Sequence, residues 1–189
     1  MKSLFIAAGL AAATAAWAAP AEPVRTRDVP INQILQGRLA QPIDLNVPVP
    51  AEYAQSGVKR IGYSYWMRPA DAATATAEKL PTRNGYLVAS LATKVTYDAR
   101  HKVFYGIDDP GSLTKMKSVA TNIQVRPFKD GKHPAVLVSM TSGTTGQPAY
   151  FMYMATGVKN DTFFLSFQPP EGRRDIGDAV WAKLAANIK

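Results

Sequence analysis

The chain has 189 residues, of which 47% are hydrophobic and 19% charged, so it suits one ordinary domain and is too short for two. It contains no cysteine, which excludes a disulfide, a thiolate nucleophile, a zinc–thiolate centre and an iron–sulfur cluster. The formal net charge of +8 favours anionic partners without identifying one.

The beginning of the chain has the pattern of a secretory signal peptide. Lys2 precedes an apolar run from Leu4 to Ala16, and Ala16-Trp17-Ala18 is the small-x-small sequence that signal peptidase reads. The run is shorter than the ~20 residues that span a bilayer. We therefore expect residues 1–18 to be a signal peptide, and the mature protein to be periplasmic or secreted without stable membrane insertion.

The next segment differs in composition from the rest of the chain. Residues 19–30 contain three prolines and few apolar side chains, a composition typical of a flexible linker. We expect order to begin near Ile31, so that residues 31–189 form a single domain.

Strand patterns follow in the first half of that domain. Residues 43–49 alternate apolar with polar or proline positions, and a second strand is expected over 58–66, with Ile61, Tyr63 and Tyr65 on one face. Residues 86–97 form a longer β pattern, and a turn then leads into 103–107. This last pair is predicted to be a hairpin.

Helical patterns are found in three places. Residues 70–79 form either a short helix after a proline or an ordered loop. Apolar residues from Leu113 to Ile123 recur at helical spacing after the start signal Asp109-Pro110. Near the end, residues 176–188 carry an apolar stripe with a four-residue repeat, which predicts an amphipathic helix that Asp175 or Asp178 could cap.

Between the last two helices lie three strand patterns, at residues 134–141, 148–156 and 162–168. They follow one another closely, so we expect an antiparallel meander. The middle strand is apolar on both faces, which predicts that both faces are covered. The expected fold class is therefore α+β, with an antiparallel β-sheet covered by helices in an α/β/α sandwich and with the middle helix supplying one layer.

Two blocks of this sequence resemble the PsbP-like and DcrB-like α/β/α sandwich families. The first is Ile43–Tyr53, a strand that runs into a proline and an aromatic turn. The second combines the three late strands, Pro169-Pro170 and the helix Asp178–Lys189. The resemblance implies a small exported or membrane-associated accessory protein that binds partners and is not an enzyme, and it transfers no functional residue.

The segment Thr141–Pro148 is similar to the phosphate loop of the adenylate-forming acyl-CoA synthetases. Such loops wrap a nucleotide's phosphates with glycines, hydroxyls and backbone N–H groups. Ala149 stands where that family carries lysine. Ser, Gly and Thr between two strands are also ordinary turn residues, and we interpret the segment as a hairpin turn.

Three methionines are the only candidate metal ligands with a defined chemistry. Met152 and Met154 share one strand face and Met140 lies near the end of the preceding strand, so three thioethers could collect Cu(I). The same side chains are typical core filler beneath a helix, which is the interpretation we favour. His101 and His133 lie in predicted turns without a carboxylate at ligand spacing, so we do not interpret them as a metal or catalytic site. Asp108-Asp109 resembles a metal-binding pair, but Asp before Pro110 is a normal helix-start sequence.

No catalytic signature was found, and no catalytic or cofactor-binding residue is predicted. Basic residues occur in small groups, so nucleic-acid binding has little support. The expected function is an exported soluble binding or accessory domain that contacts a protein or an anionic envelope component. The alternatives are a periplasmic immunity-type inhibitor, and a copper-handling protein or hydrolase whose site is not visible in sequence. Tyrosines on an open sheet face form a recognition surface, and the sequence offers five candidates without deciding which are exposed: Tyr63, Tyr65, Tyr86, Tyr150 and Tyr153.

Overall fold

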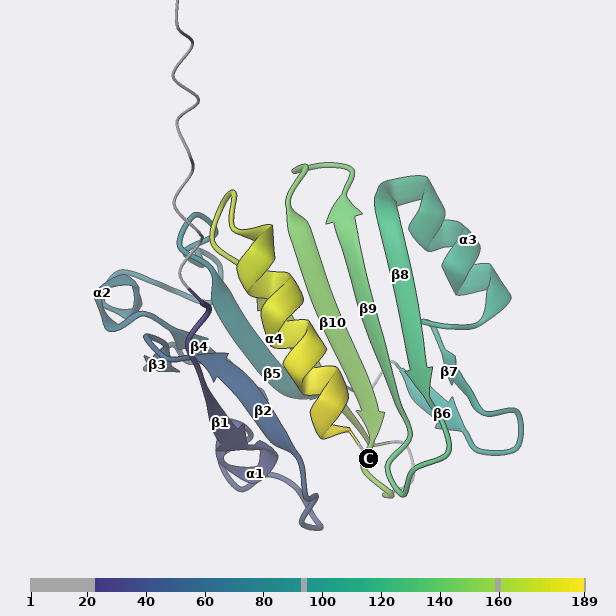
Figure 1. Ribbon diagram of the computed structural model, residues 1–189. Coiled ribbons are helices and arrows are strands. Elements are labelled where there is room, and N and C mark those ends of the chain that lie inside the picture. Colours follow the sequence, from purple (N-terminus) through teal and green to yellow (C-terminus); the bar gives the residue numbers. More distant parts are fainter. Residues whose placement is uncertain (1–22, 93–94, 159–160, 189) are drawn as a thin grey trace, which may run out of the picture.

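The chain folds around a seven-stranded antiparallel sheet with strand order β3-β4-β5-β11-β10-β9-β8 (Figure 1). The computed structural model describes residues 23–92, 95–158 and 161–188. Helices and this mainly antiparallel sheet confirm the predicted α+β class. The predicted signal peptide, residues 1–18, lies outside the described residues.

The three late strands form the centre of the sheet as predicted. They are β9 (Ala135–Ser142), β10 (Pro148–Ala155) and β11 (Thr162–Gln168), and β10 pairs antiparallel with both neighbours. In this register Met152 lies opposite Leu137 on one side and Leu165 on the other. Alternate residues of β10 therefore point to opposite faces of the sheet.

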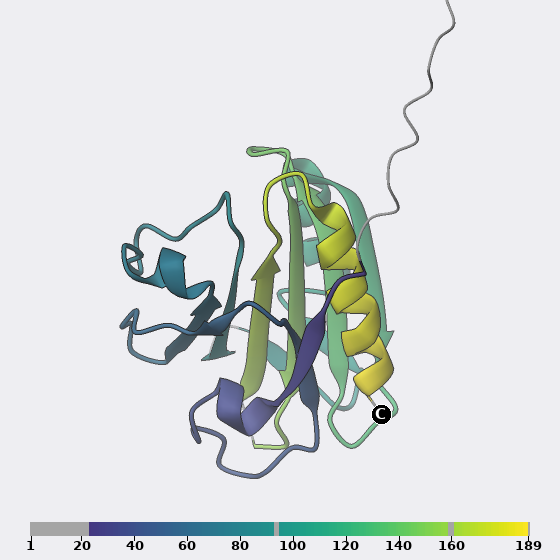
Figure 2. The ribbon, with the colours of Figure 1, turned by 60° about the vertical axis from the view of Figure 1, so that its left-hand side comes forward.

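One face of the sheet is covered by two elements that lie side by side (Figures 1 and 2). The C-terminal helix α4 (Arg174–Asn187) crosses the centre. A two-stranded ribbon of β1 (Thr26–Pro30) and β2 (Asn46–Pro50) lies beside it. The helix is fixed to the ribbon by polar contacts, because Lys183 Nζ lies 3.0 Å from Asp28 Oδ1 and Asn187 donates to the Asn46 carbonyl.

The first strand corrects the predicted linker. Thr26–Pro30 pairs over its full length with β2, and Val29 is buried in the core. A two-stranded ribbon has two free edges, so it tolerates proline at positions whose N–H would point away from the partner strand. The proline content therefore did not prevent strand formation, and order begins before Ile31. The short helix α1 (Ile31–Ile34) continues directly from this strand.

The middle helix also differs from the prediction. Helix α3 spans Pro110–Val119 and starts as expected, because the Asp109 carboxylate accepts the Ser112 N–H at 3.0 Å. Hydrogen bonds from Ser112, and one from the Gly106 N–H, lower the pKa of Asp109 to about 2. The helix ends at Val119, and β8 (Ala120–Phe128) begins at the next residue. Strand pairing with β9 therefore overrides the helical spacing that reached Ile123.

The second face of the sheet is covered mainly by a hairpin and not by the middle helix. No residue of α3 is buried, and only Met116 packs against the core there. The hairpin of β6 (Thr96–Asp98) and β7 (Val103–Tyr105) contributes Phe104, which is fully buried. The predicted hairpin is thus confirmed only at these short strands, because residues 86–92 form a separate strand of the main sheet. The second layer thus forms from strands where a helix was expected.

The remaining elements lie at the β3 end of the sheet. Their bounds are β3 (Ala54–Gln55), β4 (Tyr63–Met67), α2 (Pro69–Ala72) and β5 (Tyr86–Ala92). β4 is shorter than the predicted strand, since Ile61 is fully exposed and precedes a turn at Gly62, whose φ is +82°. Within the described ranges, no helix has the length and apolar character needed to cross a bilayer.

Candidate functional site

The structure separates the three candidate copper ligands. Met152 and Met154 point to the face beneath α4 and are 0% and 2% exposed. Met140 lies opposite Ala149, whose side chain points to the other face of the sheet. The three thioethers therefore do not converge. Within the described residues, no group of three or more His, Asp or Glu side chains is placed to hold a metal ion.

The glycine-rich segment forms the tight turn between β9 and β10. Ser142 N–H donates to the Gln147 carbonyl, Gly146 N–H to the Ser142 carbonyl, and Gly143 N–H to the Val119 carbonyl. The N–H groups of Thr145 and Gln147 donate to neighbouring hydroxyls. Because these N–H groups are already used within the protein, the turn does not offer the row of free donors that a phosphate loop needs.

The other polar residues singled out in the sequence have local partners. His101 Nδ1 lies 2.7 Å from Asp98 Oδ2, and His133 Nδ1 lies 3.3 Å from the Ala155 carbonyl oxygen. Asp108 pairs with Lys129 at 2.6 Å. These contacts are sufficient to explain the side chains as structural.

The five tyrosines do not form one surface. Tyr150 is buried beneath α4, whereas the other four point to the second face: Tyr63, Tyr65, Tyr86 and Tyr153. Tyr63 and Tyr65 stack on each other with ring centroids 6.2 Å apart. Tyr153 packs on Phe164 at 5.0 Å, and burial raises the pKa of the Tyr153 phenol to about 12. The register therefore separates Tyr150 from the other four tyrosines, and of those four Tyr65 is buried.

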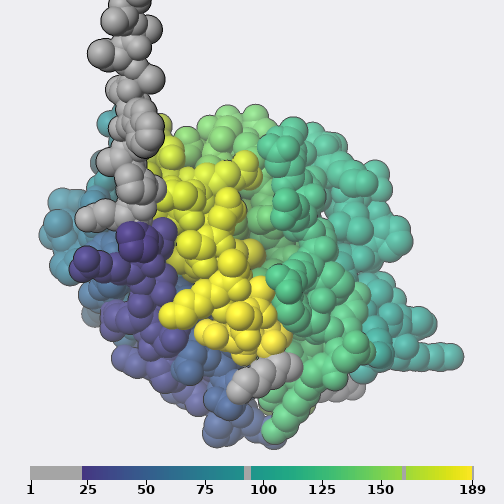
Figure 3. Space-filling model, in the orientation of Figure 1, coloured from purple at the N-terminus to yellow at the C-terminus, as the bar shows by residue number. Residues whose placement is uncertain are grey.

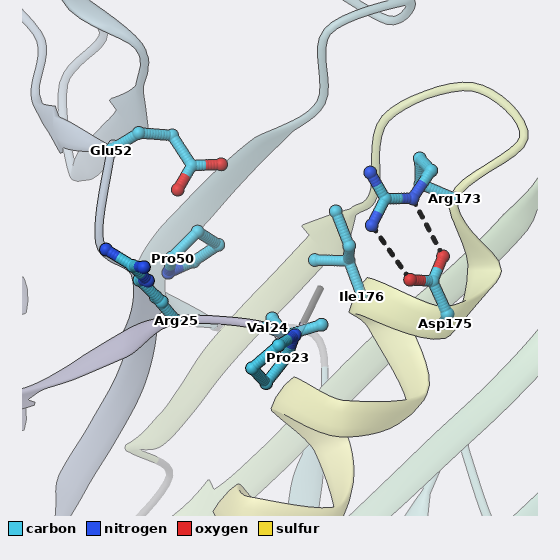
Figure 4. A pocket seen from close by; sticks show the side chains of 8 residues that line it. All are labelled: Pro23, Val24, Arg25, Pro50, Glu52, Arg173, Asp175 and Ile176. Carbon is cyan, nitrogen blue, oxygen red and sulfur yellow. Dashed lines mark hydrogen bonds and ion pairs between the residues drawn. The ribbon is translucent and has the colours of Figure 1, made fainter. Parts of the chain in front are cut away.

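One cleft lies where β1 begins beside the start of α4 (Figure 4). It has a volume of about 630 Å³ and an apolar base that includes Val24 and Ile176. Arg173 donates to both oxygens of Asp175, at 3.0 and 2.9 Å, so this ion pair is satisfied internally. Neither Asp175 nor Asp178 caps α4, which begins after Arg173 without a side-chain cap. Its lining includes Pro23, the first residue that the structure describes.

A second opening, the α4 groove, lies between α4 and the strands β8 and β9. Figure 3 shows the helix in yellow beside these green strands. Its volume is about 360 Å³. The helix side is formed by Asp178, Trp181, Ala182 and Ala185, and the sheet side by Gln124, Arg126, Leu137, Ser139 and Tyr150. The groove thus combines an apolar floor with polar groups around it, the usual composition of a recognition site.

Close packing at the start of the helix sets the depth of the α4 groove. Gly177 lies directly over the Tyr150 ring, and a Cβ at Gly177 would overlap that ring. The Tyr150 hydroxyl donates to Asp178 Oδ1 at 2.7 Å and to the Arg174 carbonyl at 3.4 Å. Burial, and then the hydrogen bond to Asp178, raise the pKa of Tyr150 above its ordinary value. The tyrosine therefore stays neutral and holds the Asp178 carboxylate in place.

Two groups that line the α4 groove, Arg126 and Trp181, lack a matching partner among the described residues, as does Arg174 at the start of α4. Arg126 lies over the Phe128 ring at 5.0 Å and pairs with no carboxylate there. Arg174 makes only a neutral contact, to the Thr141 hydroxyl at 3.2 Å. Trp181 is 7% exposed, yet its indole N–H has no acceptor in this part of the chain. An unsatisfied buried donor costs roughly 1–3 kcal/mol.

Sequence reasoning missed the α4 groove for two reasons. Gln124 and Arg126 lie in β8, in a segment for which no strand was predicted. On the helix, Ala182 and Ala185 are small apolar residues of a kind common in helices, so they do not indicate one side of a binding groove. The available signal was the spacing of residues 178, 181, 182 and 185, which places all four on one helix face.

Comparison with known proteins gives no assignment. No family model matches the chain, and no curated protein matches it. Among solved structures, a Pseudomonas aeruginosa protein described as of unknown function and as a candidate regulator is similar over 80% of this chain and 94% of its own. The identity is 10% and the TM-score 0.38. The resemblance to PsbP-like and DcrB-like families therefore remains a prediction.

Proposed function

We propose that the protein is an exported binding domain that recognises a partner protein through the α4 groove. The observation that carries this proposal is the composition of the groove. It has an apolar floor, a fixed carboxylate at Asp178 and an arginine, Arg126, without a carboxylate partner among the described residues. Such mixed openings, apolar inside and polar at the rim, are typical of specific binding sites.

The cellular setting in this proposal comes from the sequence. Residues 1–18 have the pattern of a signal peptide, and the positive net charge suits contact with the anionic cell envelope. The partner is therefore a periplasmic, secreted or envelope protein. An immunity-type inhibitor is one version of this function, in which the bound partner is an enzyme that loses its activity.

Photo-crosslinking from the α4 groove tests the proposal in cells. We expect a benzophenone amino acid in place of Ala182, which lines the groove, to form one discrete crosslink with an envelope protein after irradiation. Ala179 provides the matched control, since it is an exposed alanine of the same helix that does not line the groove. The same label there should give little or none of that product.

Two results would contradict the proposed function. If the Ala182 label gave no crosslink although the protein was folded and exported, the α4 groove would not be a binding site. Equal crosslinking from both positions would show non-specific contact with the helix. Assay of the identified partner, if it is an enzyme, with and without this protein separates an inhibitor from an accessory domain.

A further inference from the structure

This inference rests on the proposed function and concerns the chemistry of the partner. The two charged side chains that line the α4 groove differ in their partners. Among the described lining residues, Asp178 is the one acid, and its carboxylate already accepts a hydrogen bond from the Tyr150 hydroxyl. Arg126 is the one base, and it pairs with no carboxylate of the described residues. The charged group left without a polar partner for a ligand to meet is therefore the Arg126 guanidinium.

The floor of the α4 groove is apolar and narrow. Leu137 is 2% exposed, and Trp181 and Ala185 are also buried. The volume of about 360 Å³ suits a side chain with adjoining backbone, and is too small to enclose a folded element. An apolar side chain would gain roughly 1.5–3 kcal/mol from full burial in such a site, and would sit close to the arginine.

The indole N–H of Trp181 favours a ligand that presents a backbone carbonyl oxygen. Trp181 Nε1 has no acceptor among the described residues. A carbonyl oxygen of a chain in the α4 groove would supply one after a small side-chain adjustment of the kind common at interfaces. The free oxygen of Asp178 can accept an N–H from the same chain. An extended peptide presents both groups.

We propose that the α4 groove binds an acidic segment of the partner protein. An apolar side chain of that segment enters between Trp181 and Leu137, and a neighbouring carboxylate pairs with Arg126. A guanidinium binds a carboxylate through two parallel hydrogen bonds, which fixes the position of the segment as well as attracting it.

The groove is a better docking site than the neighbouring edge of the sheet. β8 is the last strand of the sheet, and no strand of the described residues pairs with its outer edge. A bulge interrupts its register between Thr121 and Gln124, and Pro127 removes one N–H near the other end. Both features oppose the addition of another strand. The segment is therefore expected to bind through side chains in the groove.

Selection of peptides tests this chemistry directly. A displayed library of random twelve-residue peptides, selected on the mature wild-type protein, should enrich sequences with Asp or Glu next to a large apolar residue. In a fluorescence titration, Arg126→Glu should weaken binding of the best peptide by at least about tenfold, because it reverses the paired charge. Lys79→Glu makes the same charge change at an exposed position away from the α4 groove and should alter binding less than about twofold.

The outcomes distinguish this inference from the proposed function. Enrichment of basic or uncharged peptides, or equal losses in Arg126→Glu and Lys79→Glu, would overturn the acidic-segment assignment. If the Ala182 crosslink forms equally well in Arg126→Glu, a partner is bound but not by its acid group. Vesicles of phosphatidylglycerol test whether the α4 groove binds an anionic lipid. Binding that is lost in Arg126→Glu with vesicles but not with any peptide would assign the groove to a lipid and contradict the inference.

Discussion

Replacement of Gly177 by alanine is expected to destabilise the protein by about 1–3 kcal/mol, the usual cost of overfilling a packed core. The added Cβ would overlap the Tyr150 ring, so α4 must move away from β10. Helix propensity alone gives the opposite sign, because alanine in a helix interior is better than glycine by about 1 kcal/mol. Urea unfolding of the two proteins therefore separates the two explanations.

The control for Gly177 is another glycine without close neighbours. A Cβ at Gly57 would meet no atom within 4 Å, and its φ is not positive. Gly57→Ala should leave the free energy of unfolding within about 0.5 kcal/mol of wild type. A stabilised Gly177→Ala would show that the close contact with Tyr150 does not limit the approach of α4.

Truncation of Met152 to alanine is expected to cost about 2–5 kcal/mol, the range for large-to-small changes in a core. Met152 is 0% exposed and lies between Leu137 and Leu165 in the sheet, beneath the helix layer. Met152→Leu preserves most of the volume and should cost less than about 1.5 kcal/mol. Denaturant unfolding measures both changes.

A Cu(I)-binding assay distinguishes a core role of Met152 from a role as a metal ligand. If the residue is core, wild type and Met152→Leu should take up equally little Cu(I) in competition with a chromogenic chelator. Met140→Ala serves as the matched methionine control, since Met140 is only half-buried and lies on the other face. Stoichiometric Cu(I) uptake that disappears in folded Met152→Leu would reject the core interpretation.

The sequence predicted correctly those elements in which the apolar periodicity matches the side of the element that is buried in the fold. The meander from residue 134 to 168 and the C-terminal helix were correct because their apolar periodicity is also their burial pattern. Ala120–Phe128 was not predicted as a strand, since its first apolar residues, Ala120 and Ile123, happen to follow helical spacing from Leu113. Only pairing with β9, a long-range interaction, decides that segment.

The candidate site depended on information that a linear sequence does not contain. Register decides that Met140 faces away from Met152, because one strand position changes the face. The α4 groove is lined by both Arg126 of β8 and Asp178 of α4, two residues far apart in the chain. Its helix wall was visible as a spacing, but nothing in the sequence gave the strand that lies opposite.

The central claim is that a partner binds in the α4 groove. Amide hydrogen exchange, measured on the protein with and without the partner identified by crosslinking, tests it most directly. We expect slower exchange in residues 121–128 of β8 and 174–187 of α4, and no change in residues 69–80. Protection confined to residues 69–80 or 96–105, with none along β8 and α4, would contradict it.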